Sequence, residues 1–501
     1  MKVVDSSKLD NAIKVTADAI REKTGVANKL TWSTDSGFAD IIKDISVTSG
    51  SDIGNIHSKL SLDLESLMRW HDFIYYDTIE QAIDDIMANT IGEKSTTDNT
   101  NSKVVVYIDE GIPHLVLLEN CNILSTIDVT VDMVLILNGC KLTVNDTNAI
   151  KIQSNKVTID GRVNGSKIDI SSSVPAQNIS AIHLVSGNCI INGGEFNSLT
   201  LGAGTRANPN GMIIAESGTN LIIDNAKLLA KDNNVGAINA IFMHENSTLY
   251  STNCIIEADS KDGLSPDAIY SYGDIELINC NIVGKSNHVA NSTGKDYGAT
   301  SRGINSQGGS VKAINCYVAG THSGMTVKGN LYVEGCVFES YSHGGIYVST
   351  GGKDVYLSNC IIQQCKMFDG YVADTIAGTN NAGVYIGGAS NINLYVDNCK
   401  FYGIQQPIVL RGSSGESNNR LYISNSYINL NYKNYGIRND GSNYTYFGIG
   451  NNFGVNNLRY KRNYEETGAD YSEFIPCETQ TEIWTFEMVD GSSITKEVIV
   501  K

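Results

Sequence analysis

One short pattern recurs eight times between Leu221 and Ile428, and it constrains the fold of this 501-residue chain more than any other feature. Each copy has a small residue at its centre, Asn or Gly immediately before it, and apolar residues five places before and two places after it. A pattern that returns every few tens of residues is typical of a solenoid, whose repeats pack only against their neighbours. The eight centres are Ala226, Cys254, Cys280, Cys316, Cys336, Cys360, Cys399 and Ser426.

The spacing within each copy predicts a bent pair of strands. Residues five and three places before the centre share one face of a strand, since side chains alternate with period two. The centre and the apolar residue two places later form a second set that is out of phase with the first. A bend must therefore lie between the two sets, and the Asn or Gly there tolerates the left-handed (αL) conformation best. Each unit is predicted to be strand, αL corner, strand.

A second series of apolar residues, mostly preceded by a small residue, accompanies the first. Two series per repeat and the return segment predict three short strands per turn, which is a right-handed parallel β-helix. The return after the corner strand is shortest after Cys316 and longest over residues 284–302 and 364–382, so insertions are expected at one corner. The second series is Met212, Ile241, Ile269, Ile304, Met325, Ile346, Val384, Ile408 and Ile437.

Eleven cysteines occur, and most of them follow the repeat. Stacked at one inward position, they are interpreted as small buried hydrophobic residues with reduced thiols. A disulfide framework is the alternative, against which the odd number and the spacing argue. The sequence contains no Cys-x-x-Cys motif and no Cys/His cluster, so no metal site of this kind and no cofactor are expected. Ca²⁺ on loop carboxylates stays open, although the twelve-residue EF-hand signature is missing.

The segments before the β-helix are predicted to be helical. Residues 1–48 form a small module with two apolar stripes, and residues 49–100 form a neck and a cap. Apolar spacings of three and four from Ile53 to Ile74 fit either a short coiled coil or a plain amphipathic helix. A helix over 77–89, with a capping box of Asp77 and Glu80, is expected to close the open end of the solenoid.

Two sets of strings carry a resemblance to known proteins. LDNAIKVTADAIREKTG and SGFADIIKDI resemble the N-terminal module of tail proteins from phages and prophages of Gram-positive bacteria. DTIEQAIDDI, then VVVYIDEGIPHLVL and LILNGCKLTV, is similar to the start of pectate-lyase-like β-helices in phage tailspikes. The resemblance implies attachment to other tail or baseplate proteins through the N-terminal module and a homotrimer. It also implies a place in the virion, at the tail or baseplate tip, after assembly in the bacterial cytoplasm.

The β-helix is expected to span residues 101–440. Its early turns are predicted from further copies of the corner pair, and residues 441–501 are predicted to form a small C-terminal β domain. Trp484 and Phe486 before Asp490-Gly491 indicate a hairpin there. The expected early corner pairs are Asn120-Cys121, Gly139-Cys140 and Asn188-Cys189.

Composition narrows the range of partners. The net charge of -17 argues against nucleic acid and anionic membranes. No apolar run is long enough to span a bilayer, and the N-terminus lacks the apolar core of a signal peptide. A host-encoded surface adhesin is therefore disfavoured.

The candidates for chemistry lie in the corner loops. No G-x-S-x-G, H-E-x-x-H or phosphate-binding loop occurs. Glycan cleavage would need paired carboxylates or a base, for which Asp259, Asp262 and Asp267 are the candidates. The candidates for glycan contact are Tyr297, Arg302, His322, His343 and Tyr371.

Tyrosines crowd the last turns and leave two interpretations open. Their rings could stack on sugars, or they could line outer strand faces or a subunit interface. They are Tyr402, Tyr422, Tyr427, Tyr432, Tyr435, Tyr444 and Tyr446.

The sequence thus supports two functional hypotheses. The first is a tail fibre or tailspike that binds a bacterial surface glycan through its corner loops without cleaving it. The alternative is a polysaccharide depolymerase, either a glycoside hydrolase or a lyase, that uses loop carboxylates.

Overall fold

The structure is a computed structural model, and the chain divides into two compact units, Met1–Leu67 and Met68–Lys501. All residues that the structure describes belong to the second unit. The predictions for residues 1–48 and for the helix from Ile53 therefore lie outside the described residues. The structure describes residues 72–91, 102–123, 125–144, 148–171, 179–200, 210–232, 238–260, 266–286, 301–340, 344–364, 382–387, 391–402, 406–411, 419–429, 435–439, 444–449, 459–462, 465–467, 475–476, 481–487 and 493–499.

A helix and three antiparallel strands begin the second unit. β1 (Ile74–Tyr76) pairs with β2 (Val104–Asp109), which pairs with β3 (Ile112–Leu117). Helix α5 (Ile79–Ala88) buries Ile79, Ala82, Ile83 and Ile86 against the core, as its spacing predicts. Two details differ from the sequence-based prediction. The N-cap is Thr78, not Asp77, because the extended Thr78 accepts a hydrogen bond from the Gln81 amide at 3.3 Å, and Ile74 lies in a strand.

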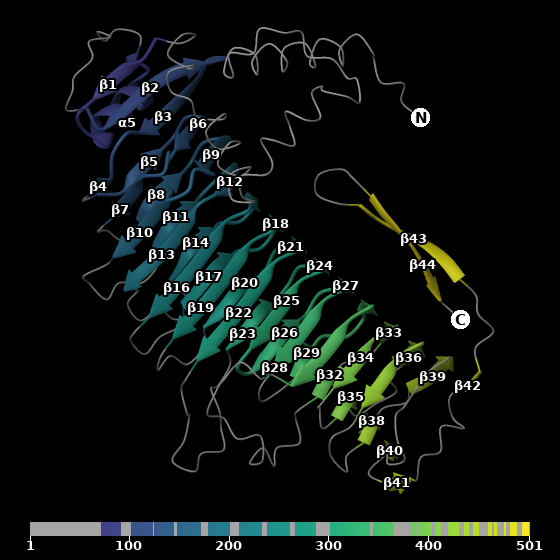
Figure 1. Ribbon diagram of the computed structural model, residues 1–501. Helices are drawn as coiled ribbons and strands as arrows, with labels where there is room; N and C mark the ends of the chain where they lie inside the picture. Colours follow the sequence, from purple (N-terminus) through teal and green to yellow (C-terminus); the bar gives the residue numbers. More distant parts are fainter. Residues whose placement is uncertain are drawn as a thin grey trace, which may run out of the picture. The chain divides into compact units, whose positions relative to one another are not determined.

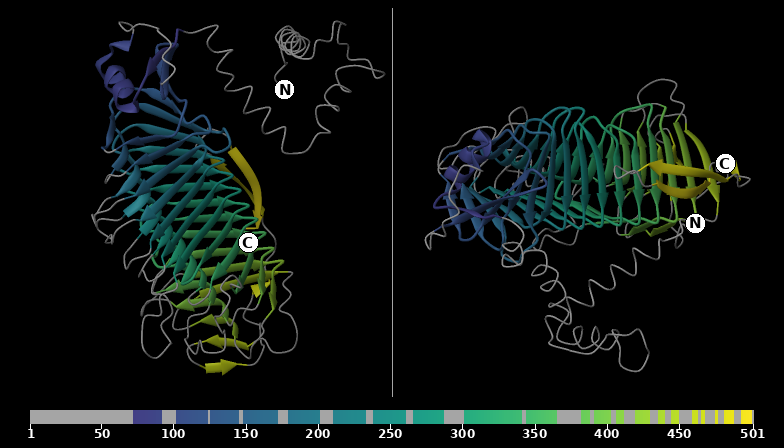
Figure 2. Two further views of the ribbon diagram at one scale, coloured as in Figure 1. Left: turned by 60° about the vertical axis from the view of Figure 1, so that its left-hand side comes forward. Right: turned by 90° about the horizontal axis from the view of Figure 1, so that it is seen from above.

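Three long sheets follow, and every neighbouring strand from β3 to β38 pairs in parallel (Figure 1). We call them sheets A, B and C in the order in which the chain visits them in each turn. This is a right-handed parallel β-helix, as predicted. Figure 2 shows the same stack of turns from two further directions.

Sheet A continues from β1–β3 through thirteen further strands. They are β6 (Met133–Ile136), β9 (Lys156–Gly161), β12 (Asn188–Gly193), β15 (Asn220–Asp224), β18 (Thr248–Thr252), β21 (Asp274–Ile278), β24 (Val311–Ile314), β27 (Leu331–Glu334), β30 (Asp354–Ser358), β33 (Asn393–Asp397), β36 (Asn419–Ser424), β39 (Tyr444–Ile449) and β42 (Ile475–Pro476).

Sheet B has twelve strands. They are β4 (Cys121–Ile123), β7 (Lys141–Val144), β10 (Lys167–Ser171), β13 (Glu195–Thr200), β16 (Lys227–Asp232), β19 (Ile255–Ser260), β22 (Asn281–Ser286), β25 (Tyr317–Gly320), β28 (Val337–Ser340), β31 (Ile361–Gln364), β34 (Lys400–Tyr402) and β37 (Tyr427–Asn429).

Sheet C has fourteen strands. They are β5 (Ile127–Val129), β8 (Asn148–Ile152), β11 (Ser180–Leu184), β14 (Asn210–Ala215), β17 (Ile238–Met243), β20 (Asp267–Ser271), β23 (Arg302–Ser306), β26 (Ser323–Val327), β29 (Gly344–Val348), β32 (Ala382–Gly387), β35 (Gln406–Arg411), β38 (Tyr435–Asn439), β40 (Arg459–Arg462) and β41 (Glu465–Thr467).

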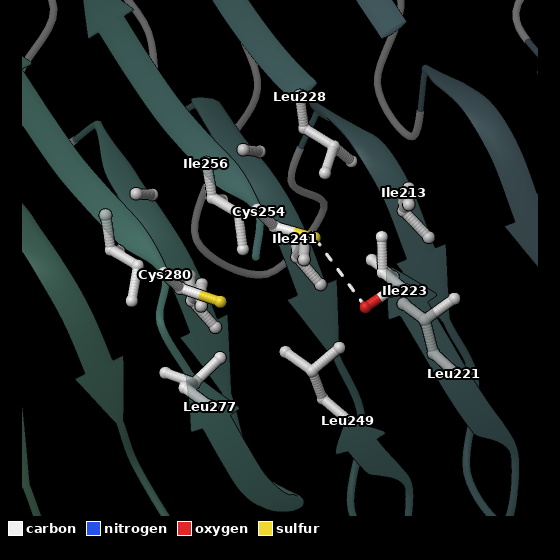
Figure 3. Close-up of a cluster of buried hydrophobic side chains, with 14 of the residues drawn as sticks. Ile213, Leu221, Ile223, Leu228, Ile241, Leu249, Cys254, Ile256, Leu277 and Cys280 are labelled. Atoms are coloured by element: carbon white, nitrogen blue, oxygen red, sulfur yellow. Dashed lines mark hydrogen bonds between the residues drawn. The ribbon is translucent and has the colours of Figure 1, made fainter. Parts of the chain in front are cut away.

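The repeated pattern is the corner between sheets A and B, which we call the A–B corner. All eight residues before the centres have positive φ, from 47° at Asn398 to 64° at Gly335, so the predicted αL corner is confirmed. All eight centres are buried, with at most 3% of their surface exposed. Figure 3 shows two of them, Cys254 and Cys280, among leucine and isoleucine side chains of the interior.

The early copies of the corner pair are only partly as expected. Gly139-Cys140 keeps the corner position, since Gly139 has a φ of 76° and Lys141 opens β7. Cys121 pairs in register with Leu142, which stands two places after the centre Cys140. Cys189 pairs with Leu221, which stands five places before the centre Ala226. Both thiols therefore fill strand positions of the interior, because any small apolar side chain fits there. In the turn of Cys189 the corner is Gly193-Gly194.

The second series is confirmed in eight of its nine positions. Ile241 to Ile437 form one continuous register through sheet C. Met212 is the exception, because Ile213 is the residue that pairs with Ile241.

The cysteines do more than fill space. All nine cysteines within the described residues are free, and burial raises the pKa of Cys189 to about 12. The backbone N–H of Cys280 donates to Sγ of Cys316 at 3.5 Å, and that of Cys316 donates to Sγ of Cys336 at 3.2 Å. Each corner thiol from Cys254 to Cys399 also donates to the carbonyl two residues earlier. The thiols of Cys316 and Cys336 thus supply acceptors for two buried backbone N–H groups of the corner.

The longest connections of the β-helix join sheets B and C, which confirms that insertions collect at one corner. They lie between Ser286 and Arg302 and between Gln364 and Ala382. Pairing in sheets A and C also continues past residue 440, through β39 and β40. The predicted C-terminal hairpin is present as β43 (Thr481–Glu487) and β44 (Ser493–Ile499).

Candidate functional site

Sheet C carries a column of outward-facing side chains that varies from turn to turn. The residue after each inward-facing member of the second series points away from the interior, since side chains alternate. We call the set the outer column of sheet C. It runs from an aromatic stretch through a polar stretch to a second aromatic stretch. In register order it is His183, Ile214, Phe242, Tyr270, Asn305, Thr326, Tyr347, Tyr385 and Val409.

The aromatic members contact one another along the column. Phe242 stacks on Tyr270 with ring centroids 5.3 Å apart, and Tyr272 packs edge-on against both rings. The hydroxyls of Tyr270 and Tyr272 are 3.2 Å apart. Further along, Tyr347 and Tyr385 lie 5.1 Å apart. These rings form small clusters separate from the interior core, so they lie on the outer face of the sheet. Phe242, Tyr270 and Tyr385 are buried in these clusters, and Tyr272 and Tyr347 are partly exposed.

Two of the predicted site residues meet at the start of two sheet C strands. Asp267 and Arg302 are register partners, with 3.7 Å between a carboxylate oxygen and the guanidinium. The other Asp267 oxygen accepts a hydrogen bond from the Asn305 amide at 2.7 Å. Both Asp267 and Arg302 are buried. Since both oxygens face donors, this carboxylate is held as an ion pair that joins adjacent turns.

His322 joins the same cluster from the next turn. It lies in the short β25–β26 connection, next to Ser323, which is the register partner of Arg302. Its Nδ1 lies 3.4 Å from the Ser323 hydroxyl, and its side chain is partly exposed. Three consecutive turns therefore bring Asp267, Arg302 and His322 to one edge of sheet C.

The remaining predicted site residues are not part of this cluster. Asp259 is partly exposed in β19, on sheet B, with Lys231 and Lys285 as its register partners. Asp262, Tyr297, His343 and Tyr371 lie outside the described residues.

A cluster that the sequence analysis missed lies at the other edge of sheet C. One carboxylate oxygen of Glu216 lies 2.8 Å from Nε2 of His183, and the other lies 3.3 Å from Nε2 of His244. The side chains of His183, Glu216 and His244 are 18%, 36% and 40% exposed, so the cluster is accessible. One signal could have located it, because Glu216, His244 and Tyr272 each stand three residues after the inward Ile213, Ile241 and Ile269.

The tyrosines of sheet A follow a different geometry. Tyr356, Tyr395 and Tyr422 stack nearly parallel, with centroids 4.5 and 4.6 Å apart and interplanar angles of 10° and 6°. Burial raises the pKa of Tyr395 to about 12. Rings stacked in this way cover one another's faces, which are the surfaces that sugars stack on, and the same holds for Phe242 and Tyr270 on sheet C. For Tyr422 the outer-face interpretation is therefore favoured over sugar stacking.

Metal chemistry has no site among the described residues. No group of three or more His, Cys, Asp or Glu side chains there could hold a metal ion. In the cluster of His183, Glu216 and His244, each imidazole faces a different oxygen of Glu216. The expectation about Ca²⁺ stays a prediction. Within the described part of the chain, no helix is long and apolar enough to cross a membrane.

Comparison with known proteins adds little to this geometry. The class of protein is that of the parallel β-helices, which the strand pairing of the chain itself defines. No protein-family model matches the chain, and no curated protein matches it. One solved structure that it is similar to is the alginate lyase AlyF-OU02 in complex with G6, with 8% identity and a TM-score of 0.27. That match covers 72% of this chain and 87% of the lyase.

Proposed function

We propose that this protein is a phage (or phage-derived particle) tail fibre or tailspike that binds a bacterial surface glycan along the outer face of sheet C. The tail context comes from the resemblance of its N-terminal strings. Attachment to the tail through residues 1–48, a homotrimeric state and a place in the virion are parts of this proposal.

One observation supports glycan binding more than any other. The outer face of sheet C and its edges carry the partly exposed rings of Tyr272 and Tyr347, which pack against the buried Phe242 and Tyr385, together with the partly exposed hydrogen-bonding side chains of His183 and His322. Sugars are bound by such a combination of apolar ring surface and polar groups. At the A–B corner, the centres are buried and the thiols form hydrogen bonds with the corner backbone.

The geometry favours binding over cleavage. A general acid or nucleophile needs a carboxylate that is free to meet the substrate. Asp267 faces Arg302 and Asn305 instead, and Asp259 stands between lysine positions on another sheet.

A binding assay with matched variants tests the proposal. Purified trimer or monomer, whichever forms, is mixed with surface glycans extracted from a panel of Gram-positive bacteria. Tyr347→Ala, on sheet C, should weaken binding to the bound glycan roughly tenfold. Tyr422→Ala, an equally half-buried stacked tyrosine on sheet A, should leave binding unchanged.

Two results would contradict the proposal. Binding to no glycan of the panel would remove the receptor role. Release of shortened chains from a bound glycan would show a depolymerase instead. The mass of the particle in solution separately tests the homotrimer.

A further inference from the structure

The accessible cluster around Glu216 has a chemistry of its own. The Glu216 side chain is about one-third exposed, and the partly exposed Tyr272 lies one turn beyond His244. The buried Phe242 supports these groups, since its ring centroid lies 4.9 Å from that of His244 and 6.3 Å from that of Tyr272. Tyr272 is therefore the ring that is left partly exposed. A carboxylate beside aromatic rings is the arrangement in which proteins bind organic cations.

The carboxylate keeps capacity for a ligand. A carboxylate has about four acceptor sites. His183 is hydrogen-bonded to one oxygen of Glu216 at 2.8 Å, and His244 Nε2 lies 3.3 Å from the other. The remaining sites require donors. An ammonium group supplies three N–H donors and a positive charge, and it makes stronger hydrogen bonds to a carboxylate than a sugar hydroxyl does.

The surrounding charge has the sign that a cation needs. The turns that follow β11, β14, β17 and β20 contain Glu216 and Glu245 but no Lys or Arg. Lys151, the register partner of His183 one turn earlier, pairs with Asp128 at 3.8 Å. The whole chain carries a net charge of -17. Such a field raises the local concentration of cations and disfavours anionic polymers.

We infer that this cluster, formed by His183, Glu216, His244, Phe242 and Tyr272, is a subsite for a primary ammonium group on the glycan. The ligand class is an amino sugar that is not N-acetylated. The inference rests on the proposed glycan binding and adds to it the charge of the sugar that is recognised. Glu216 accepts hydrogen bonds from the ammonium, and Tyr272 contributes its ring and hydroxyl.

Two forms of one oligosaccharide test the inference. Chitin oligosaccharides and their de-N-acetylated counterparts of equal length differ only in the amino groups. By calorimetry, the de-N-acetylated form should bind the full chain at least about tenfold more tightly, and the preference should shrink at high salt. Glu216→Gln, which keeps the shape of the side chain, should abolish the preference.

A matched control separates the site from the overall charge. Glu195 on sheet B is 37% exposed, against 36% for Glu216, so Glu195→Gln removes an equally exposed charge elsewhere. It should leave the preference intact. Equal binding of the two forms, binding of neither while a bacterial glycan still binds, or a preference that survives Glu216→Gln would each overturn the inference and leave the proposed function standing. Failure to bind any glycan would overturn both.

Discussion

The A–B corner and the outer face of sheet C belong to the same turns, yet they follow opposite rules. At the corner, the αL residue donates its N–H to the next turn, as Asn315 does to Glu334 O at 2.8 Å, and the next residue is small and buried. On the outer face, one register passes through His183, Phe242, Asn305 and Tyr385, which share no property. At the corner, the backbone needs an αL residue and a small neighbour, so the same residue types recur in each turn. On the outer face, side chains contact only other side chains, so the residue types can differ from turn to turn.

The largest effect should come from a charge at the corner. Cys316→Asp buries a carboxylate among apolar side chains and should lower the free energy of unfolding by about 4 kcal/mol or more. Cys316→Ala removes the acceptor of the Cys280 N–H and should cost about 1–2 kcal/mol. Cys316→Ser should cost less than Cys316→Ala, because Ser426 already accepts the Cys399 N–H at 3.1 Å.

Denaturant unfolding measures this series. The same charge at a partly exposed edge position, His322→Asp, provides the comparison and should change the free energy of unfolding by less than about 1 kcal/mol. If Cys316→Ala were as stable as Cys316→Ser, the thiols would be space-filling residues only.

The next largest loss of stability is expected in sheet C and not at the A–B corner, so it tests the contrast between the two regions. Asp267→Ala leaves the buried Arg302 guanidinium without its carboxylate and should cost about 3 kcal/mol. Removing both partners should cost less than the sum of the two single changes in a double-mutant cycle. Additive costs would mean that the ion pair does not join the turns.

The smallest effect isolates the backbone of the corner. Asn359 has a φ of 56° and an exposed side chain that accepts a hydrogen bond from Asn398 at 2.7 Å. Asn359→Ala and Asn359→Gly both lose that bond, but only Ala is strained at positive φ. The Ala variant should therefore be about 1 kcal/mol less stable than the Gly variant in thermal unfolding. Equal stability would contradict the role of αL strain.

The sequence was sufficient for the fold because the corner depends on local chirality and period. Eight Asn or Gly residues next to small residues can be recognised without knowing what they pack against. The thiol hydrogen bonds could not be predicted, because the partner of Cys316 stands 20 residues away on the next turn.

The candidate site was harder to predict from the sequence, because its contacts also join residues that are far apart in the chain. Arg302 and Asp267 were both singled out as loop residues, but their contact follows from a register that crosses an insertion. His183, Glu216 and His244 are far apart in sequence, and only the spacing of three residues from the inward isoleucines relates two of them. Asp259 shows the converse, since it is close to Asp267 in sequence and lies on a different sheet.

The αL corner also sets how a molecule of this kind can change in length. From Asn225 to Asn398, the αL residue of each corner donates its N–H to a carbonyl of the next turn, and each later corner of this series accepts the same hydrogen bond from the turn before. These turns therefore have equivalent ends. Insertion or deletion of one whole turn therefore leaves all remaining corners closed and shifts everything beyond it by a single strand spacing, about 4.8 Å. The length of the β-helix can therefore change in evolution in steps of that size, independently of what its outer face binds.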